Sequence, residues 1–203
     1  MRMSKRMLCA TAALLAPAVG VHAAPLTVVT VGAPAVNCVF NPTCKVTVTD
    51  SVGTIPLPGA TGAADLQSRT YKGVRGTKGQ GLTAYVYRVD LTQAVGVVAA
   101  PCVVSLALDF GPVTKLAYAG PLADVFVVTS GGLGTIGIGS ADKVGNVITF
   151  TFASPVCSGS SPGKGDTSYF FGLAAKTAPK SITAQVQRAP GGAVGVPARV
   201  PIH

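Results

Sequence analysis

The chain contains no glutamate and no tryptophan, and its only histidines are His22 and His203. Nucleophilic triads and most zinc centres depend on histidine, so neither can be assembled within residues 24–188. The seven acidic residues are all aspartates and stand apart in the sequence, which gives no carboxylate pair and no Asp-x-Asp calcium cluster. We therefore expect no catalytic residue, no metal site and no cofactor.

The scarcity of helix-forming residues directs the fold prediction. Helices normally draw on Glu, Lys, Ala and Leu, whereas this chain draws on Val, Thr, Gly and Pro. We find no internal repeat and no convincing amphipathic helix. The composition predicts an all-β protein.

The N-terminus has the pattern of a cleaved signal peptide over residues 1–23. Three cations within the first six residues precede an apolar run over residues 7–21, and small side chains occupy the two positions that signal peptidase reads. This run is too short for a comfortable membrane span and contains Pro17. We expect cleavage after Ala23, a secreted or periplasmic protein, and no integral membrane span in the mature chain.

Export changes the meaning of the four cysteines that remain after cleavage, because an even number in an oxidising compartment favours disulfides. Of the three possible pairings we favour Cys38–Cys44 and Cys102–Cys157. A zinc site is the alternative, but neither pair has Cys-x2-Cys spacing and histidine is missing.

Short alternating segments bounded by turn residues predict an antiparallel β-sandwich of nine or ten strands in a single domain over residues 24–188. The residues from 189 to 203 are rich in Pro and Gly, and we interpret them as a mobile tail. A transmembrane barrel would fit the length, but the aromatic girdles of such barrels are missing. The expected strands are 26–31, 45–49, 67–75, 82–91, 102–110, 113–118, 124–129, 146–153, 168–174 and 180–188.

The stretch from Cys102 to Phe110 is the expected central strand. Successive side chains of a strand point to opposite faces. The even-numbered side chains of this stretch are apolar and should face the core, while the odd-numbered ones are smaller and more polar.

Two short motifs suggest chemistry and are set aside. Residues 132–137 read G-x-G-x-x-G, but the residues that follow are Ile-Gly-Ser rather than a helix start. Residues 166–168 read Asp-Thr-Ser, as in aspartic proteases, yet that reaction needs two carboxylates and residues 50–52 are only a faint second copy. An Asp-dependent hydrolase remains a minor alternative.

A basic segment offers the clearest candidate binding site. Arg69, Lys72, Arg75 and Lys78 recur at intervals of three, with Tyr71 among them and no acid before Asp90. On a hairpin tip these residues would create a local positive field for an anionic polysaccharide, a lipid head group or extracellular nucleic acid. Alternatively, the cations only protect an exposed strand edge from aggregation.

These observations predict an exported, non-enzymatic β-sandwich with a structural or interaction role at a surface, where its partner would be another surface protein. The first alternative is a binding module for an anionic polymer, centred on the basic segment.

Overall fold

The computed structural model describes residues 23–203; the predicted signal peptide lies outside them except for Ala23. Within these residues no helix has the length and apolar character needed to cross a membrane.

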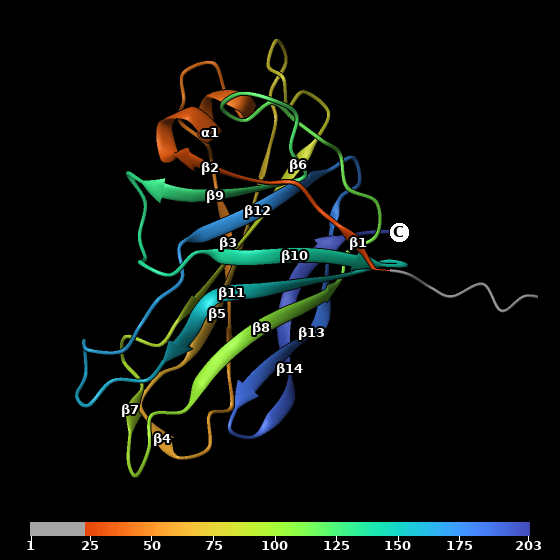
Figure 1. The fold of residues 1–203 in the computed structure, drawn as a ribbon. Coiled ribbons are helices and arrows are strands. Elements are labelled where there is room, and N and C mark those ends of the chain that lie inside the picture. Colours follow the sequence, from red (N-terminus) through yellow and green to blue (C-terminus); the bar gives the residue numbers. More distant parts are fainter. Residues whose placement is uncertain (1–22) are drawn as a thin grey trace, which may run out of the picture.

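Two six-stranded sheets form the body of the molecule (Figure 1). All pairings are antiparallel except that of β2 with β9. The A sheet has the order β1 (Ala24–Pro25), β10 (Ile138–Val144), β11 (Val147–Cys157), β8 (Cys102–Asp109), β13 (Pro179–Ala189), β14 (Gly192–Pro201). The B sheet has the order β2 (Val28–Gly32), β9 (Val125–Ser130), β12 (Phe170–Ala175), β6 (Thr83–Asp90), β5 (Asp65–Lys72), β3 (Thr49–Thr54). A small ribbon pairs β4 (Ala60–Thr61) with β7 (Val95–Gly96), and the helix is α1 (Ala33–Phe40). The all-β prediction is confirmed.

The main core lies between the two sheets. Phe150 of β11 and Phe171 of β12 face each other with ring centroids 4.9 Å apart, and the ring of Tyr85 meets the edge of Phe110 at 5.4 Å. The buried hydroxyl of Tyr87 donates to the carbonyl of Arg199 at 2.6 Å. The hydroxyl of Tyr85 likewise donates to the Thr177 carbonyl at 2.7 Å. These two tyrosines therefore bury their rings in the main core without an unsatisfied hydroxyl.

The central strand β8 follows the predicted alternation over only part of its length. Leu106 and Leu108 point into the core as expected, but Val103 is fully buried whereas Cys102 and Val104 are half-buried. Both neighbouring strands change register opposite this stretch. A β-bulge shifts the facing of side chains by one residue, which explains the error.

The outer face of the B sheet carries a second core that the sequence analysis missed. Helix α1 covers this face, and Phe40 at its end meets the edge of Tyr71 with ring centroids 5.2 Å apart. Tyr118, from the connection between β8 and β9, packs on Phe126 at 4.7 Å. The B sheet is therefore buried on both sides, as β12 shows by being buried at every residue.

The prediction of a mobile tail is wrong for residues 192–201. They form β14, which pairs with β13 along ten consecutive residues. Val196, Ala198 and Val200 alternate into the core. Two further predictions also fail, because the structure has no strand at 45–48 or 113–118 and adds β10, which was not expected.

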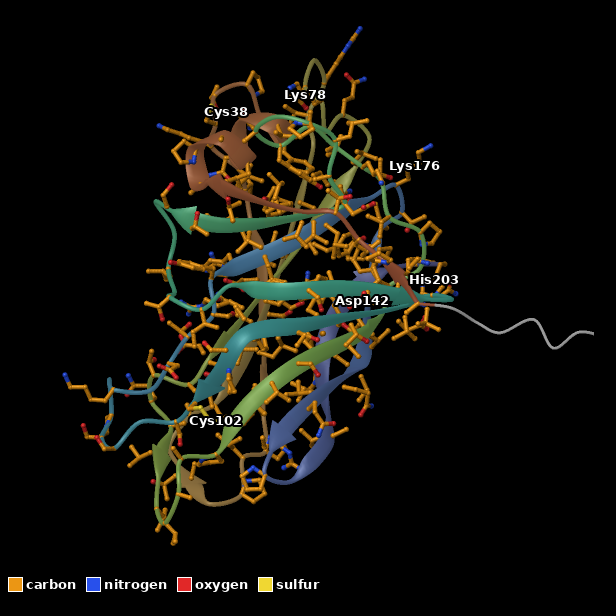
Figure 2. The ribbon with its side chains drawn as sticks, viewed as in Figure 1. Cys38, Lys78, Cys102, Asp142, Lys176 and His203 are labelled. Carbon is orange, nitrogen blue, oxygen red and sulfur yellow. A yellow bond between two sulfur atoms is a disulfide. The ribbon has the colours of Figure 1, made fainter. Side chains whose placement is uncertain are left out.

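Both predicted disulfides are present. Cys102–Cys157 joins β8 to its neighbour β11, and Cys38–Cys44 ties α1 to the loop that follows it. Figure 2 shows Cys38 and Cys102 towards opposite ends of the sandwich.

Candidate functional site

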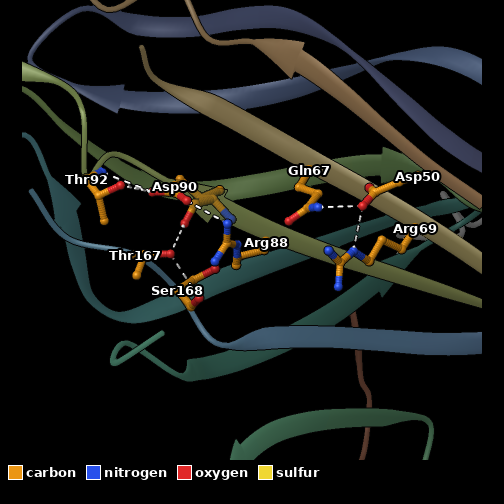
Figure 3. Close-up of polar contacts among 9 residues, drawn as sticks. Asp50, Gln67, Arg69, Arg88, Asp90, Thr92, Thr167 and Ser168 are labelled. Carbon is orange, nitrogen blue, oxygen red and sulfur yellow. Dashed lines mark hydrogen bonds and ion pairs between the residues drawn. The ribbon is translucent and has the colours of Figure 1, made fainter. Parts of the chain in front are cut away.

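The structure separates the residues of the basic segment. Arg69 lies on the outer face of the B sheet, where its Nε donates to Asp50 Oδ2 at 2.9 Å (Figure 3). Its guanidinium also lies over the ring of Phe170, 4.4 Å from the centroid. Arg69 is therefore held in place by a carboxylate and by an aromatic ring.

Tyr71 belongs to the outer core and is only 7% exposed. Burial raises the pKa of its hydroxyl well above the ordinary value of 10.0. It supports the surrounding surface by packing against Phe40 and does not present an exposed ring to solvent.

Arg75 and Lys78 are exposed in the connection between β5 and β6. This connection is anchored on α1, because the Val74 N–H donates to the Phe40 carbonyl at 2.9 Å and the Gly79 N–H donates to the Val39 carbonyl at 2.8 Å. Any Cβ at position 79 would collide with the Phe40 ring, which explains the need for glycine there. The basic loop is therefore fixed against the helix.

Lys72, at the end of β5, lies in a groove of about 360 Å³ that we call the threonine groove. The groove runs where the B sheet approaches β13 and β14 of the A sheet. Two of its residues are cations and none is an acid. It is lined by Asn41, Val46, Thr47, Thr49, Thr70, Tyr71, Lys72, Val74, Thr83, Pro179 and Arg199.

Arg199 is the second cation of the threonine groove, and sequence analysis missed it because it fell in the expected tail. Its backbone is fixed on both sides: the N–H donates to Ser68 Oγ at 2.9 Å and the carbonyl accepts from Tyr87. The alternation of Val196, Ala198 and Val200 was the sequence signal that could have revealed its strand.

The threonines come together through strand pairing. Thr49 lies opposite Thr70, and Thr83 lies opposite Lys72. Cross-strand neighbours on one face bring their side chains close together, so the groove presents several hydroxyls beside an ammonium group.

The positive charge of the groove is not neutralised from within residues 23–203. The ion pairs found there join Asp50 to Arg69, Asp90 to Arg88, Asp124 to Lys115 and Asp109 to His203, and none involves Lys72 or Arg199. Lys180 borders an adjacent hollow of about 220 Å³ that shares Pro179 and Arg199 with the groove. Lys72, Lys180 and Arg199 thus line two neighbouring hollows.

The three residues of the Asp-Thr-Ser motif at 166–168 make hydrogen bonds that hold the fold together. Asp166 Oδ2 accepts the Cys157 N–H at 3.0 Å, and fully buried Ser168 accepts the Val89 N–H at 2.9 Å. The hydroxyl of Thr167 donates to the Val89 carbonyl at 3.0 Å (Figure 3). These three residues connect β6 to the segment before β12. The Asp166 carboxylate and the hydroxyls of Thr167 and Ser168 are all engaged in hydrogen bonds to the backbone.

The glycine motif and the C-terminal histidine also have structural positions in the fold. The glycines at 132–137 lie between β9 and β10 and are not followed by a helix. His203 packs over Gly111, with its Nε2 3.1 Å from Asp109 Oδ1, so it is not on a mobile tail as we expected. Residues 23–203 contain no cluster of three or more His, Cys, Asp or Glu side chains that would suit a metal ion.

Comparison with known proteins gives no relative: no protein-family model, no curated protein and no solved structure matches this chain. The basic segment contributes residues to two separate surfaces, the outer face of the B sheet at Arg69 and the threonine groove at Lys72.

Proposed function

We propose that the protein is an exported, non-enzymatic binding module that holds an anionic polysaccharide in the threonine groove. The observation that carries this proposal is a groove with two cations, four threonines and no acid in its lining. Ammonium and guanidinium groups bind carboxylates or sulfates, while hydroxyls can donate to and accept from sugar hydroxyls.

A polymer fits this surface better than a single small anion. Lys180 extends the cationic surface beyond Arg199. On the anchored loop, Arg75 and Lys78 extend the row of positive charges beyond Lys72. Charges spread in this way engage successive acidic groups of one chain, and several weak contacts on one ligand add to its affinity.

A polysaccharide is favoured over single-stranded nucleic acid by the location of the aromatic side chains. Every Phe and Tyr of the chain lies in the described residues, and all are buried except half-buried Tyr169. Binding of single strands uses exposed rings on which bases stack. This surface offers charges and hydroxyls instead.

The proposed location is the periplasm or the outside of the cell. The signal-peptide pattern of residues 1–23 supports export. Two disulfides, one of them between neighbouring core strands, are typical of proteins that mature in an oxidising compartment.

The test is salt-gradient elution of the oxidised mature chain from immobilised heparin and polygalacturonate. The groove variant is Lys72→Gln/Arg199→Gln, and the matched control is Lys143→Gln/Lys164→Gln, which removes the same charge from residues outside the groove. We expect the groove variant to elute at clearly lower salt than the control. Each lost contact should reduce the slope of log affinity against log salt by about one unit.

Two results would overturn the proposal. Equal elution of the groove variant and the control would mean that only net charge matters, and passage of the wild type at physiological salt would mean that no polyanion binds. Stronger retention on single-stranded DNA than on both polysaccharides would show that the preferred ligand is nucleic acid, and would overturn the choice of a polysaccharide.

A further inference from the structure

A second groove lies on the outer face of the B sheet and has a different character. This outer-face groove has a volume of about 300 Å³, at the lower end of the range for small-ligand sites. Its floor consists of side chains from four strands, and its walls are α1, residues 46–48 and the glycine loop at 131–133. The floor residues are Tyr71, Val86, Phe126, Val128 and Phe170.

The lining of the outer-face groove is mainly apolar, and its rim leaves apolar groups in water. Leu133 is 57% exposed and Val48 is 38% exposed, and both line the groove. Exposed aliphatic groups at the mouth of a groove favour an apolar ligand that removes them from water.

One charged group stands in this apolar lining, namely Arg69. Its Nε is used by Asp50 and one face of its guanidinium is stacked on Phe170, whereas the structure gives its Nη groups no hydrogen-bond partner in residues 23–203. The side chain is 31% exposed, so these N–H groups remain accessible to a ligand. Two parallel N–H groups of a guanidinium match the oxygens of a carboxylate, sulfonate or phosphate.

From this combination we propose that the outer-face groove binds a small amphiphile, with its aliphatic or aromatic body against the exposed side chains of Val48 and Leu133 and its anionic head at Arg69. The site is separate from the threonine groove, because it lies on the other side of residues 46–48 and shares only Val46 and Tyr71 with it. The proposal therefore stands independently of polysaccharide binding.

The neighbouring arginine provides a matched control. Arg88 also lies over Phe170, 5.1 Å from the centroid, and is also paired with an aspartate, through Nη2 at 2.6 Å from Asp90 Oδ2. It does not line the groove. Arg69→Gln and Arg88→Gln therefore remove similar local interactions, and only the first removes the proposed anchor for the head group.

The experiment uses the oxidised mature chain with the fluorescent sulfonate 1-anilinonaphthalene-8-sulfonate as the probe, and decanoate and decan-1-ol as competitors. We expect wild type and Arg88→Gln to bind the probe and release it to decanoate at a lower concentration than to decanol. In Arg69→Gln, decanoate should lose about tenfold in affinity while decanol is unchanged, because the charged hydrogen bonds to the head are gone. Thermal unfolding followed by circular dichroism establishes that each variant is folded.

Two further variants keep the proposal testable if Arg69→Gln fails to fold. Asp50→Asn frees Arg69 from its carboxylate and should strengthen decanoate binding severalfold. Leu133→Asp places a charge on the rim and should weaken both competitors, whereas Val52→Asp, on an exposed residue outside the groove, should change neither.

Equal affinity of the wild type for decanoate and decanol would show that Arg69 does not bind the anionic head group, and would overturn the proposal. Equal effects of Leu133→Asp and Val52→Asp would show that the probe binds elsewhere and overturn the site. Binding to phosphatidylglycerol vesicles without binding of monomeric decanoate would also overturn it, since the surface would then recognise a membrane rather than a free amphiphile.

Discussion

The two disulfides differ in the length of chain that they close, and this difference predicts unequal contributions to stability. Cys102 and Cys157 are 55 residues apart, whereas Cys38 and Cys44 are 6 residues apart. In the chain-entropy model, closing the longer loop restricts the unfolded chain by about 4 kcal/mol and closing the shorter one by about 2 kcal/mol. Replacing each pair by serine should therefore lower the free energy of unfolding by different amounts.

The entropy calculation applies to Cys102–Cys157 because the folded state does not need this bond to bring the two residues together. The two residues are direct partners in the pairing of β8 with β11, so strand pairing already holds them together in the folded state. The loop that they close contains β8, β9, β10 and β11, all of which are free to separate when the unfolded chain is not cross-linked. The loss should thus come mainly from the unfolded state.

The assay is equilibrium unfolding in urea, followed by circular dichroism, for the wild type and the two double variants. We expect Cys102→Ser/Cys157→Ser to lose about 2 kcal/mol more than Cys38→Ser/Cys44→Ser. Its denaturant slope should also rise, because an unfolded chain without the cross-link exposes more surface. A larger loss for the short loop, or an unchanged slope for the long one, would refute the unfolded-state argument.

Three further predictions concern the fold. Ending the chain after Ala189 removes β14 and uncovers the edge of β13, so the truncated protein should lose its cooperative thermal transition in calorimetry. Burial raises the pKa of Tyr85 from 10.0 to about 12, so the unfolded state releases this proton first. The free energy of unfolding should consequently fall between pH 10 and pH 12, as urea titrations at each pH would show. Asp65 lies opposite Asp90, and burial together with that charge raises its pKa. Asp65→Asn should therefore stabilise the protein at neutral pH by only about 0.2 kcal/mol, because water screens this partly exposed pair, and the gain should disappear once acid protonates Asp65.

The sheets could be predicted wherever alternation was uninterrupted. Residues 148–152 and 182–186 alternate between apolar and polar side chains, and both segments lie in strands of the A sheet. The same signal in β14 was obscured, because Pro197 and two glycines break up the row of small aliphatic residues. β14 lies at the edge of the A sheet, the usual place for proline in a sheet.

Helix α1 could not be predicted from local preference. Its eight residues include Pro34 and two β-branched valines, and no side chain caps its N-terminus. Val36, Val39 and Phe40 are buried on the B sheet, and Cys38 is cross-linked to Cys44 just beyond its end. Tertiary packing and the disulfide therefore supply what the sequence of the helix lacks.

The threonine groove could be predicted only in part. Lys72 was identified because it lies among other cations, but Arg199 is 127 positions away in the sequence (199 − 72 = 127). The two come together because β14 packs beside β5 and β3, a contact between sheets that no local pattern encodes. The threonines gave no signal of their own, since threonine is ordinary in strands.

The spacing of the basic segment explains why it serves two surfaces. Side chains of a strand alternate with a period of two, so cations three residues apart cannot share one face. Arg69 accordingly points outward beside Phe170, and Lys72 lines the groove between the sheets, while Arg75 and Lys78 lie beyond the end of β5. A single flat patch would require cations at every second residue. The interval of three instead places one cation in the outer-face groove and another in the threonine groove, which is why each groove has its own charge and its own ligand chemistry.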